Sequence, residues 1–314
     1  MNYGDLIKDA IWITLRNRYL WFFGFFVGLG SGGCGGGGGS GGGEDFDEQS
    51  SAEIASVSAL AVQQGALSNA LLIVALVVLV LLILVVFFAL YVVSQGGLTE
   101  SVAAIERGEA RRFSSTWRAG TRYFWRVLGQ ILLFAGIVLG LLLAVGIPVG
   151  LLVAGAFATD STTMKVLAVV VAVPVVIVLL FVIFIPLAIV RQFARRELVV
   201  RGERVLSSVG SGYRLFLHNF GRGLLVWLIQ LGLMLGAAIA LVIALLIVGL
   251  LLFLPTIILA VAGSSTAAIV AGVVAGLILL PLLIVALAIL GTFNHSYWTL
   301  AYLRLTPEEG TVRP

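Results

Sequence analysis

Charged residues are scarce in this sequence. Only 11% of the 314 residues are Asp, Glu, Lys or Arg, whereas 61% are hydrophobic and the mean hydropathy is +1.15. Soluble domains carry about 25% charged residues. A chain with so few charges has too little polar surface to face water, so its solvent must be lipid, where about 20 apolar residues make one helical span. We therefore expect an all-α, polytopic membrane helical bundle that forms a single integral membrane domain over residues 1–314.

Cysteine and histidine are also rare. The single cysteine, Cys34, excludes an intramolecular disulfide and a cysteine-based metal site. The two histidines, His218 and His295, have no second His or Cys at ligand spacing, and the glycine-rich tract lacks the Gly-Lys-Ser/Thr of a phosphate loop. The sequence contains no Ser–His–Asp set. We therefore expect no enzymatic activity, no cofactor, no metal site and no nucleic-acid partner.

The predicted span interiors lack titratable side chains. Ion-coupled transporters usually keep an acidic, basic or histidine side chain inside the membrane to move a proton or an ion. The most polar residues of the apolar runs are Gln230 and Gln130. This absence argues against proton-coupled transport.

Long apolar runs are what the chain has instead, at residues 19–30, 68–93, 128–158, 166–190, 224–262 and 267–293. We predict about six transmembrane helices from them. The first run is short and must borrow apolar residues such as Trp12 and Ile13 from the helix before it. The fifth run holds about 39 residues, which is too long for one span. Pro255 near its end favours one span followed by a broken or re-entrant segment, and two spans are the alternative.

The basic residues fall almost entirely on one side of these runs. Of the 19 lysines and arginines, all except Lys165 lie before the first run, after the last, or in the segments that join the second to the third and the fourth to the fifth. The positive-inside rule assigns that side to the cytoplasm. We therefore expect both termini, including a tail at residues 296–314, to be cytoplasmic in a multi-pass protein of a prokaryotic cell (plasma) membrane. A flexible glycine-rich, acidic loop at residues 30–50 would lie outside.

Two cytoplasmic segments are similar to one another. Arg107-Gly108-Glu109 opens one and Arg201-Gly202-Glu203 the other, and further residues then match at a constant offset of 92: Arg112, Ser115, Gly120, Arg122, Phe124 and Gly129 with Arg204, Ser207, Gly212, Arg214, Phe216 and Gly221. When the N-terminal stretch is aligned with these two segments, Trp12 aligns with Arg122 and Arg214, and Arg16 aligns with Arg126 and His218. The sequence predicts an internal repeat of three units, approximately 3–93, 98–190 and 197–293, each an amphipathic interfacial helix followed by a helical hairpin.

A basic stripe borders the aromatic face of these predicted interfacial helices. Helical spacing places Trp117, Thr121, Phe124, Trp125 and Leu128 on one face, and the adjoining stripes are Arg118, Arg122 and Arg126 in one copy and Arg214, His218 and Arg222 in the other. Such a pattern is typical of a helix at the membrane interface, where each basic residue attracts anionic lipid by about 1 kcal/mol. We predict that these six residues bind lipid headgroups or a partner. The alternative is that they only anchor the helices.

The chain resembles an uncharacterised bacterial group of membrane proteins. The resemblance rests on the Phe/Trp-rich N-terminus, the two basic segments, the six-span layout and phrases such as Tyr213-Arg214-Leu215-Phe216-Leu217-His218-Asn219-Phe220. This group includes the membrane domain found N-terminal to some glycerophosphoryl diester phosphodiesterases and the YciC-like proteins. The resemblance implies a membrane domain without the soluble phosphodiesterase and carries over no catalytic residue.

Two functions are compatible with these features. The first is a non-catalytic scaffold or accessory protein whose partners are membrane lipids, a membrane protein or a second copy of the chain. The second is a transporter or permease for a neutral or lipidic solute, with a path lined by Pro148, Pro174, Pro186 and Pro255. In either case, the glycines at positions 136, 140, 146 and 150 are predicted to allow close helix packing.

Overall fold

The computed structural model describes residues 2–30, 66–159 and 161–306, and these residues form eight α-helices and no strand. The helices are α1 (Tyr3–Arg16), α2 (Leu20–Gly30), α4 (Ala66–Glu106), α5 (Phe113–Phe157), α6 (Thr162–Val200), α7 (Val205–His218), α8 (Phe220–Val261) and α9 (Ser265–Leu305). The predicted all-α fold is confirmed. Cys34 and most of the predicted outer loop lie outside the described residues.

Five of these helices, α4, α5, α6, α8 and α9, are long and apolar enough to cross a membrane. The chain is therefore a membrane-embedded, polytopic helical protein. The first predicted span corresponds to α2, which has only 11 residues. At 1.5 Å per residue α2 extends about 16 Å, roughly half the thickness of the hydrocarbon layer. A sixth span therefore stays a prediction.

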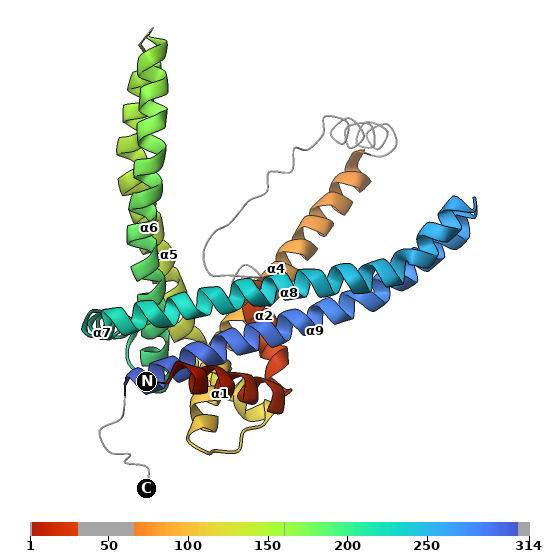
Figure 1. Ribbon diagram of the computed structural model, residues 1–314, viewed down its shortest axis with the longest axis horizontal. Helices are drawn as coiled ribbons and strands as arrows, with labels where there is room; N and C mark the ends of the chain where they lie inside the picture. Colours follow the sequence, from red (N-terminus) through yellow and green to blue (C-terminus); the bar gives the residue numbers. More distant parts are fainter. Residues whose placement is uncertain (1, 31–65, 160, 307–314) are drawn as a thin grey trace.

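The protein core lies at one end of the long helices. In Figure 1, the hairpins α5–α6 and α8–α9 and the helix α4 diverge as three arms from a common base. The base contains α1, α2, α7 and the adjoining ends of the long helices, and its largest buried side chains include Phe23, Phe193 and Trp298. In the most apolar stretch of each arm, almost no residue is buried within the protein. Because the arms do not cover one another, lipid must cover their apolar side chains.

The fifth apolar run differs from both sequence-based alternatives. It forms one continuous helix of 42 residues, α8, with Pro255 inside it. The predicted break and the predicted pair of spans are both wrong. Proline lacks the amide that would bond to the carbonyl four residues earlier, but helices in membrane proteins tolerate it because neighbouring groups satisfy the freed carbonyl. Other prolines, Pro148, Pro174, Pro186 and Pro281, also lie inside continuous helices.

The last helix extends further than predicted. Residues 296–305, assigned to a cytoplasmic tail from the sequence, continue α9 and are largely buried, with Tyr297, Trp298 and Tyr302 in the core. Aromatic residues in this segment explain its burial, because each removes a large apolar area from water. A tail can therefore begin only after α9.

The first apolar run also does not extend the helix before it. α1 ends at Arg16, and the Asn17 side-chain amide donates to the carbonyl of Ile13 at 3.0 Å. α7 ends in the same way, with the Asn219 amide donating to the carbonyl of Leu215 at 3.4 Å. An asparagine that binds the preceding turn competes with helix continuation. α1 and α2 are therefore separate helices, and the residues that the first run was expected to borrow, such as Trp12 and Ile13, belong to α1.

The helices α1, α5 and α7 begin at equivalent positions of the three predicted repeat units. Their first residues, Tyr3, Phe113 and Val205, are separated by the same 110 and 92 residues that relate the sequence matches. In both Arg-Gly-Glu turns the glycine has a positive φ, +85° at Gly108 and +69° at Gly202, which glycine adopts without steric cost. α1 packs on α9, the start of α5 on α4, and α7 on α6. Each of these helices thus packs on a long helix that ends at the base.

The short α2 makes the position of the N-terminus a direct test of the span count. If residues 20–65 cross the membrane once, epitope tags at the two termini are expected on the same side, because five further spans follow. Protease protection of tagged protein in sealed vesicles of known orientation measures this. Tags found on opposite sides would show that α2 does not belong to a span.

Candidate functional site

The first basic stripe lies on the exposed side of α5. Arg118, Arg122 and Arg126 are all exposed. The Arg122 guanidinium lies over the Tyr123 ring, 5.7 Å from its centroid, and Arg126 Nη1 donates to the carbonyl of Gly202 at 3.1 Å. The Arg118 guanidinium makes no hydrogen bond or ion pair within the described ranges. Arg126 thus connects α5 to the turn before α7, while Arg118 is free to bind a ligand.

The second basic stripe is exposed as well. Arg214 and His218 lie on α7 and Arg222 lies in the first turn of α8. Among the described residues, none of these three side chains has a hydrogen-bond or ion-pair partner. The structure therefore presents all six predicted residues at the surface but on two separate helical segments, α5 and α7–α8, joined by the Arg126 contact.

Small residues form the sides of these helices that face the protein. Gly120 of α5 approaches α4 so closely that an added Cβ would lie 2.3 Å from the carbonyl oxygen of Val93. Gly212 of α7 occupies the matching position, where a Cβ would lie 2.7 Å from the amide nitrogen of Ala194 on α6. Trp117 and Trp125 of the aromatic face lie outward with the arginines, and Trp125 is 77% exposed. Phe124 and Leu128 of the same face are partly buried against the core.

A groove lies between α2 and the first turns of α5. It has a volume of about 690 Å³ and is lined by Phe22, Phe113, Ser114, Trp117, Arg118 and Thr121. The rings of Phe113 and Trp117 are stacked, with centroids 6.3 Å apart and planes 18° apart, and the Phe22 ring meets Phe113 edge-on at 5.4 Å. The groove thus has an aromatic wall with one guanidinium and two hydroxyls beside it.

A buried polar cluster, which we call the polar hub, joins three of the long helices inside the base. Arg195 on α6 donates to the Gln95 side-chain oxygen on α4, and His295 Nε2 on α9 lies 2.8 Å from Thr99 Oγ1 on α4. Arg196 Nη1 donates to the Gln192 carbonyl and amide oxygens at 2.7 and 2.6 Å, and its Nη2 is 3.5 Å from the His295 carbonyl oxygen. Each of these acceptors is a neutral group.

Sequence reasoning missed the polar hub. It assigned Arg195 and Arg196 to a cytoplasmic connection, whereas both are buried, Arg196 completely. His295, for which the sequence offered no partner, is buried as well. A usable signal was present, because no glycine or proline separates the end of the apolar run at Val190 from Arg195 and Arg196. The hub holds α4, α6 and α9 together at the point where the arms diverge.

Comparison with known protein families identifies one match over most of the chain. Residues 18–309 match the model of the family of unknown function DUF7544. The chain belongs to this family. No curated protein and no solved structure matches it. The match confirms an uncharacterised membrane family, and the resemblance to the phosphodiesterase-linked membrane domain and the YciC-like proteins stays a prediction.

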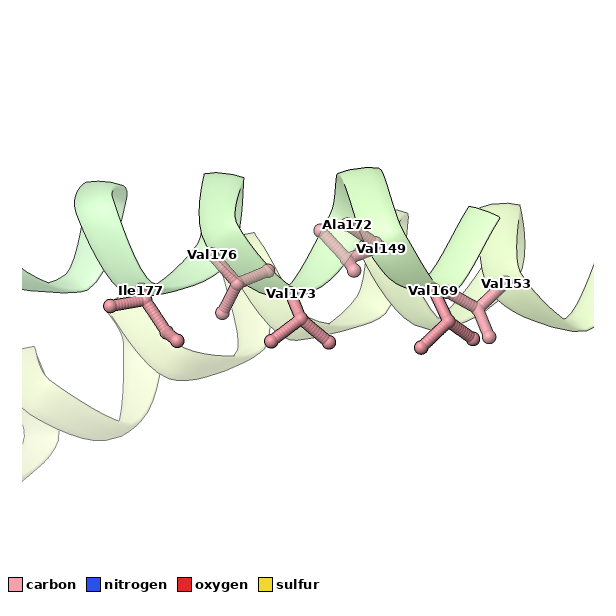
Figure 2. A pocket seen from close by; sticks show the side chains of 7 residues that line it. All are labelled: Val149, Val153, Val169, Ala172, Val173, Val176 and Ile177. Atoms are coloured by element: carbon pink, nitrogen blue, oxygen red, sulfur yellow. The ribbon is translucent and has the colours of Figure 1, made fainter. Parts of the chain in front are cut away.

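Inside the α5–α6 arm of this DUF7544 protein, an apolar gap of about 250 Å³ separates the two helices. Its lining side chains, Val149, Val153, Val169, Ala172, Val173, Val176 and Ile177, are all aliphatic (Figure 2). Val149 follows Pro148 and Val173 precedes Pro174, so this gap is where the predicted permease path would pass. A gap without polar groups fits only an apolar solute or an acyl chain.

The glycine stripe of α5 does not pack against another helix. A Cβ added at Gly136, Gly140, Gly146 or Gly150 would meet nothing within 4 Å among the described residues. The prediction that these glycines serve close packing within the chain is therefore wrong. The close approach occurs in the base instead, where Gly24 and Gly28 of α2 face Gly291 of α9.

Proposed function

We propose that this DUF7544 protein is a non-catalytic membrane scaffold or accessory protein that contacts anionic lipid through its basic helices at the cytoplasmic face of the cell membrane. The observation that carries the proposal is the outward orientation of α5. Trp117, Trp125 and the arginine stripe share the exposed side, whereas Ala119 and Gly120 pack into the base. An aromatic face beside basic side chains suits the interface between acyl chains and anionic headgroups.

The availability of the basic side chains supports the same proposal. All of the six except Arg126 lack a hydrogen-bond or ion-pair partner among the described residues, and Arg122 contacts only the Tyr123 ring. Each arginine near an anionic surface contributes about 1 kcal/mol, and this attraction weakens as salt screens it. The matching starts of α1, α5 and α7 further support a repeat of three interfacial helices at this face.

The proposal predicts a salt-sensitive lipid preference. In detergent-purified protein, retention of phosphatidylglycerol over phosphatidylcholine is expected to fall with added salt and in the triple variant Arg118→Gln, Arg122→Gln, Arg126→Gln. Native mass spectrometry of the bound lipid measures this. Lys165→Gln, on the predicted outer side, is the control and should leave the preference unchanged.

A wild-type protein that retains both lipid classes equally would contradict the scaffold proposal. Flux of a neutral or lipidic solute through proteoliposomes would favour the permease alternative, for which the apolar gap between α5 and α6 is the supporting feature. Loss of that flux on filling the gap with Ala172→Leu would assign the path to it.

A further inference from the structure

We infer that the groove between α2 and α5 binds one anionic phospholipid, with the lipid phosphate at Arg118 and the acyl chain against the aromatic wall. This inference rests on the proposed lipid contact and assigns it to one place. It differs from general attraction to a charged surface, because a shaped site holds a lipid molecule in one position and discriminates among lipids.

The wall of the groove is apolar and preformed. Phe22, Phe113 and Trp117 contribute it, and they are 44%, 43% and 37% exposed. Phe113 also packs against the buried Phe23 ring, with centroids 5.2 Å apart. This contact fixes the wall against the core, so lipid binding need not order the wall and loses less conformational entropy.

The charge of the groove selects an anion. Arg118 is the only ionisable residue among the six that line it, and its guanidinium is unpaired within the described ranges. The Ser114 and Thr121 hydroxyls lie on the same helix. The Thr121 hydroxyl already donates to the carbonyls of Trp117 and Arg118, at 3.2 and 3.0 Å. The donors left for a phosphate are therefore the Arg118 guanidinium and the Ser114 hydroxyl.

The apolar surface beyond the groove selects a lipid over a free phosphate. Trp117, Trp125 and Leu132 share a face of α5 at i, i+8 and i+15, and Trp125 and Leu132 are 77% and 61% exposed. This face leads from the groove into the charge-free run that starts at residue 128. A molecule with an anionic head and a long apolar tail can contact Arg118 in the groove and the apolar face of α5 beyond it.

The equivalent position on α1 shows what the groove requires. Lys8 occupies the column of Arg118, and it also lines a surface depression. Its neighbours there include Asp5, Asp9 and Glu106, and Arg304 is bonded to Asp9. Because carboxylates surround Lys8, the depression on α1 would repel a phosphate.

The test compares two arginines that carry the same charge. Purified full-length protein is titrated with phosphatidylglycerol, and the first tightly bound lipid is followed by native mass spectrometry. Arg118→Gln is expected to weaken binding of that lipid about tenfold or more, since a charge-assisted hydrogen bond contributes about 1.5–3 kcal/mol. Trp117→Ala is also expected to weaken it, because it removes apolar contact area from the wall of the groove. Arg214→Gln, which removes an exposed, unpaired arginine from α7, should leave it unchanged. Trp117→Phe, which keeps an aromatic wall, should retain most of the binding.

The remaining outcomes separate this inference from the proposed function. Equal weakening by Arg118→Gln and Arg214→Gln would overturn the groove site while preserving the general lipid contact. A wild-type protein without preference for phosphatidylglycerol would overturn both. Displacement of the lipid by glycerol phosphate alone would show that the site binds a free phosphate, and concentration-dependent dimerisation abolished by Trp117→Ala would show that a second copy occupies it. Unchanged unfolding temperatures of the variants establish that each is folded.

Discussion

Gly291→Ala is expected to destabilise the fold strongly, although it adds only one methyl group. The new Cβ would lie 2.1 Å from the carbonyl oxygen of Gly24 and 3.1 Å from the amide nitrogen of Gly28. Both are backbone atoms of α2, so no side chain can rotate away and α2 must separate from α9. Overpacking of this kind costs about 1–3 kcal/mol or more. Thermal unfolding in detergent and monodispersity on size exclusion measure the loss.

The same substitution at Gly276 is the matched control. Gly276 lies on the same helix, and a Cβ there would meet nothing within 4 Å among the described residues. Alanine is favoured over glycine in a helix by about 1 kcal/mol, so Gly276→Ala should leave the unfolding temperature unchanged or raise it. If Gly291→Ala behaved like Gly276→Ala, the close contact between α2 and α9 would be wrong.

Gln95→Leu is expected to have the second largest effect, through the polar hub. The Gln95 side chain is the hydrogen-bond acceptor for the buried Arg195 guanidinium, whose Nε atom already lacks a partner. Removing this acceptor strands a buried charge, and a hydrogen bond to a charged group is worth about 1.5–3 kcal/mol. Adding Arg195→Met should restore much of the lost stability, since apolar replacement of both partners removes the buried charge.

Gln130→Leu provides the comparison for this prediction. Gln130 is also buried, but neither atom of its side-chain amide has a hydrogen-bond partner in the part of the chain that the structure describes. Its replacement should therefore be neutral or stabilising in the same unfolding assay. A Gln95→Leu variant as stable as Gln130→Leu, or a double variant without recovery, would show that Arg195 does not depend on Gln95.

The sequence predicted the membrane class and most long helices because hydropathy depends on local composition. The sequence did not predict the features that depend on which helices pack against each other. Glycine spacing alone did not distinguish Gly136 and Gly140, which face open space, from Gly24 and Gly291, which meet across a helix pair. Pro255 was overestimated as a helix breaker, since it and four other prolines lie inside continuous helices.

The candidate site was predictable in part for the same reason. Helical spacing placed Arg118, Arg122 and Arg126 together on one helix, and the structure exposes them. The groove was not predictable, because it needs Phe22 from α2 beside Trp117 from α5. The partner of Arg195 was equally hidden, since Gln95 is 100 residues earlier in the chain.

The divergence of the three arms has a consequence for how the protein fits a bilayer. The apolar runs 128–158 and 224–262 would extend about 45 and 60 Å as helices, whereas the hydrocarbon layer is about 30 Å thick. Upright helices of this length would suffer severe hydrophobic mismatch, and tilting relieves it. Arms that spread from one base tilt in different directions. The lengths of the arms and their spread are therefore coupled, and a thinner bilayer would favour a wider spread.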